Sequence, residues 1–115
     1  LRLLGIDVGR LWTAFPASVA RLAAEVCARL GEPHAFEPED VPLVEGTYVG
    51  EAYGRPSDAG NAALTRLLRA EGILLDPVYT AKAFAGLLGE AAGGRLGPGE
   101  PVVFLHTGGL PALFA

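Results

Sequence analysis

Apolar residues in this chain occur as short continuous runs that alternate with longer stretches of helical period. The runs predict four strands, at Leu3–Val8, Val41–Val49, Ile73–Leu75 and Pro101–Leu105. The stretches between them predict helices that begin at Phe15-Pro16, at about Ala59 and at Val78. This order predicts an α/β fold, a mostly parallel sheet with helices on both faces.

Residues that start and stop helices mark the expected boundaries. Pro16 suits a first turn and Gly31 a C-cap, while Ser57 or Asp58 can cap the second helix, which Gly72 ends. Gly93-Gly94 stops the third helix. The apolar faces expected to point inward carry Val19, Leu22, Ala23, Val26, Cys27 and Leu30, then Leu64, Leu67 and Leu68, then Phe84, Leu87, Leu88 and Ala91.

Composition narrows the class of protein. The 115 residues are about one domain, and 50% are hydrophobic against 19% charged, which predicts apolar surface covered by something outside this sequence. No run is long enough to span a bilayer and no signal peptide is visible, so we expect no membrane partner. A net charge of −4 without a basic cluster argues against nucleic acid. The single Cys27 fits a reducing compartment and predicts a cytoplasmic protein.

Two corners between a strand and a helix are the candidate site. Asp76-Pro77-Val78-Tyr79-Thr80 follows the third strand, and His106-Thr107-Gly108-Gly109 follows the fourth. Ligands of α/β sheets bind at such strand ends, Asp76 can cap the next helix, and glycines allow close approach of a ligand. The alternatives are a plain capped helix and a plain tight turn. Tyr53, in a loop with Gly54 and Pro56, is a third candidate or simply a surface residue.

Another pattern suggests a different chemistry. Leu4-Gly5-Ile6-Asp7-Val8-Gly9-Arg10 is similar to the first strand of the sugar kinase and actin superfamily and of Holliday-junction resolvase-like nucleases, where an Asp coordinates a metal. Hard divalent metals need several oxygen ligands, and the later strand ends supply no acidic cluster. The sequence therefore disfavours a metal site at Asp7.

The motifs Tyr53–Pro56, Asp76–Tyr79 and His106–Pro111 resemble those of the pyridoxal-phosphate (PLP) enzymes of the D-cysteine desulfhydrase and 1-aminocyclopropane-1-carboxylate (ACC) deaminase family. The resemblance implies the tryptophan-synthase-β type of fold (fold type II), with PLP between two α/β domains. Residues 1–115 would then be the C-terminal part of the larger domain. The lysine that bonds PLP would belong to an N-terminal region outside this sequence; the lone Lys82 is the weaker alternative.

The resemblance also implies roles for individual residues. Tyr53 and Tyr79 would face the substrate side of PLP as catalytic residues, carrying a proton or anchoring the substrate. Thr80, Thr107 and Gly108 would bind the cofactor, with the Thr107 hydroxyl on the pyridine nitrogen. The ACC deaminases place Glu where this chain has Thr80 and Leu where it has Thr107, so two threonines resemble the desulfhydrase branch and favour α,β-elimination over ring opening.

The predicted function is therefore part of a PLP-dependent lyase or deaminase that converts D-cysteine to pyruvate, ammonia and hydrogen sulfide. ACC deamination to 2-oxobutyrate and ammonia is the alternative reaction. A non-catalytic α/β module that holds a phosphate-bearing ligand is the alternative of another class. The expected partners are a small amino-acid substrate, the remainder of the same polypeptide and a second copy in a homodimer. The chain alone should be inactive.

Overall fold

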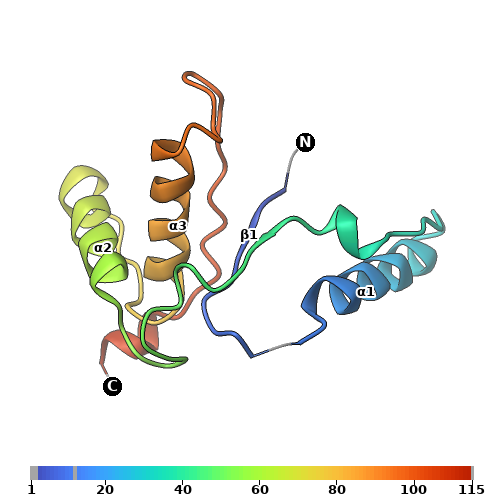
Figure 1. Cartoon of the computed structure of the whole chain (residues 1–115), viewed down its shortest axis with the longest axis horizontal. Coiled ribbons are helices and arrows are strands. Elements are labelled where there is room, and N and C mark those ends of the chain that lie inside the picture. Colours follow the sequence, from blue (N-terminus) through green and yellow to red (C-terminus); the bar gives the residue numbers. More distant parts are fainter. Residues whose placement is uncertain (1–2, 12, 115) are drawn as a thin grey trace. The chain divides into compact units, whose positions relative to one another are not determined.

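The computed structural model describes residues 3–11 and 13–114, and the chain forms two compact units. One comprises the described residues of 1–5 and 11–44, the other those of 6–10 and 45–115. The elements along the chain are β1 (Gly5–Ile6), α1 (Phe15–Arg29), the 3₁₀ helix η1 (Pro38–Asp40), β2 (Leu43–Val44), α2 (Asp58–Glu71), α3 (Thr80–Ala92) and the 3₁₀ helix η2 (Leu110–Leu113) (Figure 1).

In the first unit, α1 confirms the expected helix and its boundaries. Pro16 lies in the first turn, and Gly31 follows the helix with a left-handed φ of 82° while the Glu32 N–H donates to the Cys27 carbonyl. The expected inward face is wrong for Leu22, Val26 and Leu30, which are exposed, while Val19, Ala23 and Cys27 are half-buried and only Ala20 is buried on this helix. Leu22 and Leu30 are exposed, so the apolar stripe of α1 is not covered by the described residues.

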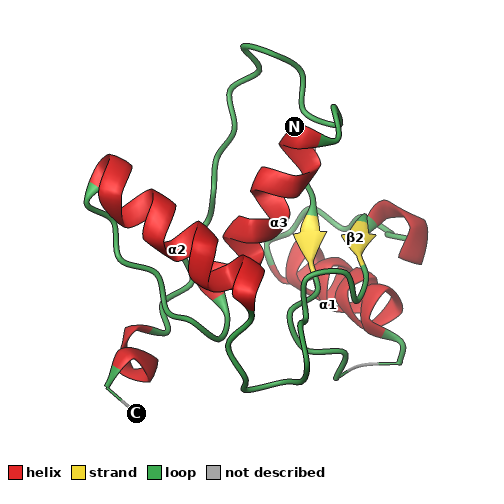
Figure 2. Cartoon of the chain, turned by 60° about the vertical axis from the view of Figure 1, so that its left-hand side comes forward, coloured by secondary structure: helices red, strands yellow, loops and turns green. Residues whose placement is uncertain are grey.

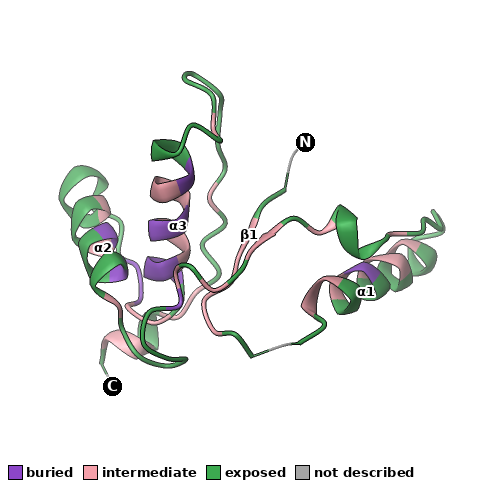
Figure 3. Ribbon diagram, viewed as in Figure 1, coloured by how far each residue is buried: buried purple, intermediate pink, exposed green. Residues whose placement is uncertain are grey.

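In the second unit, α2 and α3 pack against each other (Figure 2). Ser57 caps α2, since its Oγ accepts from the Gly60 N–H at 3.1 Å, and Gly72 ends the helix with a φ of 68°. None of the expected leucines is buried: the buried residues are Gly60 and Ala63 on α2, and on α3 the small residues Ala81, Ala85 and Gly86 together with Thr80, Lys82 and Glu90 (Figure 3). Small side chains let two helix backbones approach closely, which leaves Leu68 and Ala91 outside.

The strand predictions are confirmed only in part. β1 and β2 form a two-stranded sheet of two residues each, shorter than the expected Leu3–Val8 and Val41–Val49. Residues 73–75 and 101–105 form no strand, since within the described residues their backbone groups make no ladder hydrogen bonds. Segment 101–105 is held on one side, where Phe104 meets Phe84 of α3 edge to face at 5.3 Å, while Val103 is 89% exposed.

Gly86 explains how α3 approaches the start of the second unit so closely. A Cβ at this position would lie 2.7 Å from Cγ2 of Ile6, the last residue of β1. Glycine in a helix interior costs about 1 kcal/mol relative to alanine, so its presence here indicates that close packing on Ile6 outweighs helix propensity.

Among the described residues, no helix has the length and apolar character that crossing a membrane requires.

We predict that Gly86→Ala lowers the free energy of unfolding of the whole protein by about 1–3 kcal/mol, despite the better helix propensity of alanine, because Ile6 must move. Urea denaturation checks this. Ile6→Ala removes the three side-chain atoms nearest to the new Cβ, so the double variant should lose less than the sum of the two single variants. Strictly additive losses would contradict this account of the packing.

Candidate active site

The Asp76 carboxylate organises the corner before α3. It is fully buried; its Oδ2 accepts from the N–H groups of Val78 and Tyr79 at 2.9 and 2.7 Å, and its Oδ1 accepts from the Thr80 N–H at 2.8 Å. The Thr80 hydroxyl donates to the same Oδ1 at 2.6 Å and accepts from the Asp76 N–H at 2.9 Å. The predicted cap is confirmed, and it is more complete than a single hydrogen bond.

Two consequences follow for ligand binding. The N–H groups of residues 78–80, which would otherwise be open at the positive end of α3, are already bound to a carboxylate. The start of α3 is therefore closed to a phosphate. The Thr80 hydroxyl is buried and has both a donor and an acceptor partner, so it supports the corner, and this placement disfavours the cofactor contact predicted for Thr80.

The hydrogen bonds at this corner favour the ionised form of the Asp76 carboxyl group. Burial alone would raise the pKa of this carboxyl group, but the hydrogen bonds from the Thr80 hydroxyl and from three backbone N–H groups outweigh burial. The pKa of Asp76 is consequently below its ordinary value of 3.8. The carboxylate is ionised at neutral pH and complements the positive end of the helix.

The second corner, His106–Gly109, lies directly against the first. The motifs predicted that each corner follows a strand, but they did not predict this contact. The His106 Nδ1 accepts from the Gly108 N–H at 3.2 Å, so the proton of the neutral ring is on Nε2, which donates to the Leu74 carbonyl at 2.9 Å. A Cβ on Gly109 would lie 2.4 Å from the Asp76 Oδ1. Only a glycine, here with a φ of 92°, lets the turn approach the carboxylate so closely.

Thr107 and Gly108 occupy the open side of this second corner. Thr107 is exposed, and within the described residues no hydrogen bond uses its hydroxyl. Gly108 has a φ of 102°, and apart from its chain neighbours no atom of the described residues lies within 4 Å of the position where a Cβ would stand. A flat ligand can therefore reach the backbone of Gly108 and the hydroxyl of Thr107 together.

Tyr53 and Tyr79 come together from distant parts of the sequence. Their hydroxyl oxygens are 2.8 Å apart in a hydrogen bond, and their ring centroids are 5.8 Å apart. Both side chains are partly open, at 47% and 37% exposure. The hydrogen bond with Tyr53, together with some burial and the negative charge of Asp76, raises the pKa of Tyr79 above its ordinary value. The pair is thus a short path for a proton at an accessible surface.

Lys82 does not face this surface. It is fully buried on α3, its Nζ donates to the Ala52 carbonyl at 3.2 Å, and burial lowers its pKa. This placement disfavours Lys82 as the lysine that bonds a cofactor. The sequence pattern did not single out either the Lys82 contact or the His106 bridge, although a lone lysine on an apolar helix face is a signal that could have been used.

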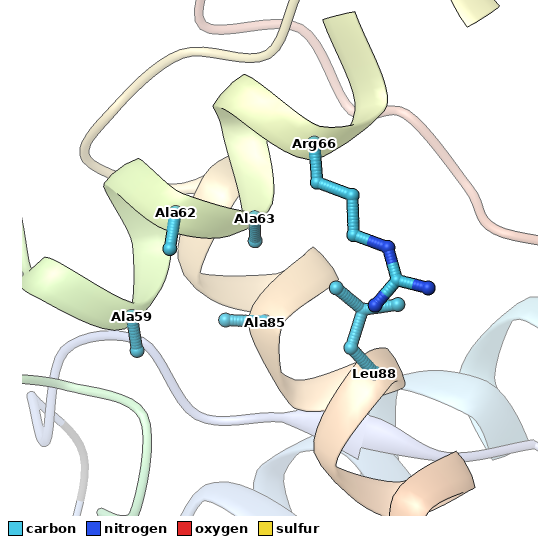
Figure 4. Close-up of a pocket in the computed structure, with 6 residues that line it drawn as sticks. All are labelled: Ala59, Ala62, Ala63, Arg66, Ala85 and Leu88. Atoms are coloured by element: carbon cyan, nitrogen blue, oxygen red, sulfur yellow. The ribbon is translucent and has the colours of Figure 1, made fainter. Parts of the chain in front are cut away.

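Two other places are poor candidates for a site. The Asp7 carboxylate accepts from the N–H groups of Gly9, Arg10 and Gly46, and no cluster of metal-ligating side chains occurs in the described part of the chain. These bonds outweigh burial and lower the pKa of Asp7. An apolar groove between α2 and α3 offers no acid–base pair (Figure 4); it is lined by Ala59, Ala62, Ala63, Arg66, Ala85 and Leu88.

Comparison with known proteins decides the family. The model of the pyridoxal-phosphate dependent enzymes matches residues 7–108. The chain belongs to this family. A D-cysteine desulfhydrase of Yersinia enterocolitica is 42% identical over 113 residues, which are 98% of this chain and 33% of that protein. One of Salmonella typhi is 38% identical over 115 residues, which are 34% of its length. A crystal structure of an ACC deaminase homologue superposes with a TM-score of 0.79 at 34% identity, covering 96% of this chain and 32% of that one.

These matches confirm the resemblance read from the motifs and the α/β fold class. The family is one of PLP-dependent enzymes, so the non-catalytic binding module and the metal site at Asp7 are both set aside. The chain spans about one third of the length of the relatives it matches. The assignment of residues 1–115 to the larger domain and the roles of single site residues stay predictions.

We predict that Asp76→Asn lowers the free energy of unfolding by about 2–3 kcal/mol at neutral pH, because the NH2 group that replaces one carboxylate oxygen cannot accept the two hydrogen bonds made to that oxygen. The folded-state pKa of Asp76 is depressed, so its contribution is complete above about pH 5 and is lost as the pH falls through the folded-state pKa. The difference between the two proteins should therefore shrink in acid, as measured by urea denaturation at several pH values.

Asp58→Asn is the matched control, since Asp58 lies in the first turn of α2 but is exposed. It should cost only a few tenths of a kcal/mol, about the value of an exposed charge near a helix start. Equal losses in the two variants would show that the hydrogen bonds of Asp76 are not what stabilises the corner.

Proposed function

We propose that the whole protein containing this chain catalyses PLP-dependent α,β-elimination of D-cysteine. The balanced reaction converts D-cysteine and water to pyruvate, ammonia and hydrogen sulfide. The observation that carries the proposal is the different state of the two threonines: the Thr80 hydroxyl is bound to Asp76, whereas that of Thr107 is open. The names of the similar desulfhydrases support the same substrate.

The residues present fit one edge of PLP. Thr107 would donate to or accept from the pyridine nitrogen, and Gly108 leaves room for the ring because its missing side chain faces open space. PLP bound there supplies an electron sink for the Cα of the amino acid. The phosphate needs another site, since the N–H groups at the start of α3 are already occupied by Asp76.

A neutral hydroxyl partner favours elimination over ring opening. A carboxylate beside the pyridine nitrogen would keep it protonated and make the ring a strong sink, whereas a hydroxyl leaves it largely unprotonated. Hydrosulfide is a good leaving group, so its departure needs less delocalisation than opening a cyclopropane. The buried carboxylate of Asp76 is turned toward the N-terminus of α3 and does not supply this charge.

Tyr53 and Tyr79 act on the substrate in this proposal. Because hydrogen bonding raises the pKa of Tyr79, its hydroxyl stays protonated at neutral pH. The pair therefore begins as a proton donor, and the 2.8 Å hydrogen bond lets Tyr53 replace a proton that Tyr79 gives up. Either hydroxyl can also anchor a carboxylate of the amino acid.

The rest of the machinery is proposed to lie in the other two thirds of the protein. That part would contribute the lysine that bonds PLP, the phosphate site and the second domain. It would also provide neighbours for segments 73–75 and 101–105, most of whose apolar side chains are exposed here, namely Ile73, Leu74, Val102, Val103 and Leu105. A homodimer and a cytoplasmic location are further expectations for the whole protein.

We expect the purified whole protein to be yellow from bound PLP and to release sulfide from D-cysteine faster than it releases ammonia from ACC. Sulfide and ammonia assays on both substrates, with L-cysteine as a stereochemical control, measure this preference. A protein that binds PLP and acts only on ACC would place it in the deaminase branch. A protein that binds no PLP would overturn the proposed function altogether.

The two threonines provide a second prediction. Thr107→Val should lower kcat for D-cysteine by about tenfold or more, because the pyridine nitrogen loses its partner, while the free energy of unfolding changes little. Thr80→Val should instead cost about 1–3 kcal/mol of stability, since it leaves a buried hydrogen-bonding group of Asp76 unpaired. Steady-state kinetics and urea denaturation of both variants distinguish these effects; a reversed pattern would make Thr80 the residue that serves the cofactor.

A further inference from the structure

Lys82 is a buried cation for which the proposed reaction has no use. It is the only lysine of the chain, and its side chain is fully buried in the second unit. Its stem packs beside α2, where a Cβ on Gly60 would lie 3.4 Å from the Lys82 Cγ. Within the described residues, no carboxylate lies within ion-pair distance of its Nζ. Burying an ammonium group without a counter-charge is unfavourable, so an apolar side chain would fill this space at lower cost.

Among the described residues, the Lys82 ammonium group makes one hydrogen bond, and this bond indicates its role. The Nζ donates to the carbonyl of Ala52, the residue before Tyr53, at 3.2 Å. Tyr79 lies three residues before Lys82 at the start of the same helix, and its hydroxyl holds the hydroxyl of Tyr53. The start of α3 therefore binds two consecutive residues of the loop formed by residues 51–56: Ala52 through its backbone carbonyl and Tyr53 through its side chain.

The loop has few other means of keeping its position. Residues 51–56 are exposed, so burial does not fix them. The loop is closed at its base, where a Cβ on Gly50 would lie 2.7 Å from the Ser57 Cβ, and one internal turn joins the Arg55 N–H to the Ala52 carbonyl. Beyond these local contacts, the described residues show only the bonds to Lys82 and Tyr79 holding its tip.

We propose that Lys82 is a positioning residue, which sets the hydroxyl of Tyr53 against that of Tyr79 by holding the Ala52 carbonyl. This inference rests on the proposed function, because it assigns Tyr53 a role in turnover. Lys82 itself touches neither substrate nor cofactor. A displacement of the loop by about 1 Å would break the 2.8 Å contact between the two tyrosines and slow proton transfer.

The test is a double-mutant cycle in the whole protein with D-cysteine as substrate. Lys82→Met keeps the apolar stem and removes the donor, and Tyr53→Phe removes the hydroxyl that the loop presents. We expect each single variant to lower kcat by about tenfold to a hundredfold with little change in KM or PLP content. The double variant should lose no more than Tyr53→Phe alone, because Lys82 acts through Tyr53.

Arg66→Met is the matched control, since it removes a cation from the neighbouring groove without touching the loop. It should leave kcat unchanged. Multiplicative losses in the Lys82 and Tyr53 double variant, or a Lys82→Met protein with unchanged kcat, would overturn the positioning role. If Tyr53→Phe itself retains full activity on D-cysteine, the proposed function of Tyr53 fails instead, so the two failures are distinguishable.

Hydrogen exchange provides a readout that does not depend on activity. In Lys82→Met, the amides of residues 51–56 should exchange faster while those of α2 and α3 keep their protection. This measurement remains informative if the variant binds PLP poorly. Faster exchange throughout both helices would instead assign Lys82 a general role in stability and would contradict the proposal.

Discussion

The carboxylate of Asp76 is the group on which the rest of the site depends. It binds the N–H groups that open α3 and the hydroxyl of Thr80, and Gly109 of the second corner lies against it. Its position therefore fixes the direction of α3 and the distance between the two corners at once. Because Tyr79 and Lys82 project from the first turns of this helix, the loop that carries Tyr53 is placed by the same interaction.

This arrangement separates support from chemistry among similar residue types. Of the two threonines, Thr80 completes the buried hydrogen bonds of Asp76, and Thr107 is left open on the far corner. The glycines differ in the same way: a side chain at Gly109 would collide with Asp76, whereas one at Gly108 would meet open space. The proposed cofactor contacts involve the Thr107 hydroxyl, which makes no hydrogen bond within the described residues, and Gly108, which has open space beside it.

The second unit also shows how a piece of an α/β fold differs from the sheet to which it is similar. The helices and their caps form from local hydrogen bonds, so they are present in a chain that spans about a third of its relatives. Strands need paired backbones, and segments 73–75 and 101–105 make no ladder hydrogen bonds among the described residues. Their exposed side chains, with Val103 foremost, match the excess of apolar residues in the composition.

The sequence by itself determined the three helices, the caps at Ser57, Gly72 and Asp76, and the family, because each depends on neighbouring residues or on short motifs. It also pointed to Tyr53, Tyr79 and Thr107 through the resemblance. Only the tertiary structure decided which residues meet: the pairing of the tyrosines, the bridge from His106 to Leu74, and the contact of Lys82 with Ala52. These contacts join residues 26 to 32 positions apart, a separation at which hydrophobic period and capping carry no information.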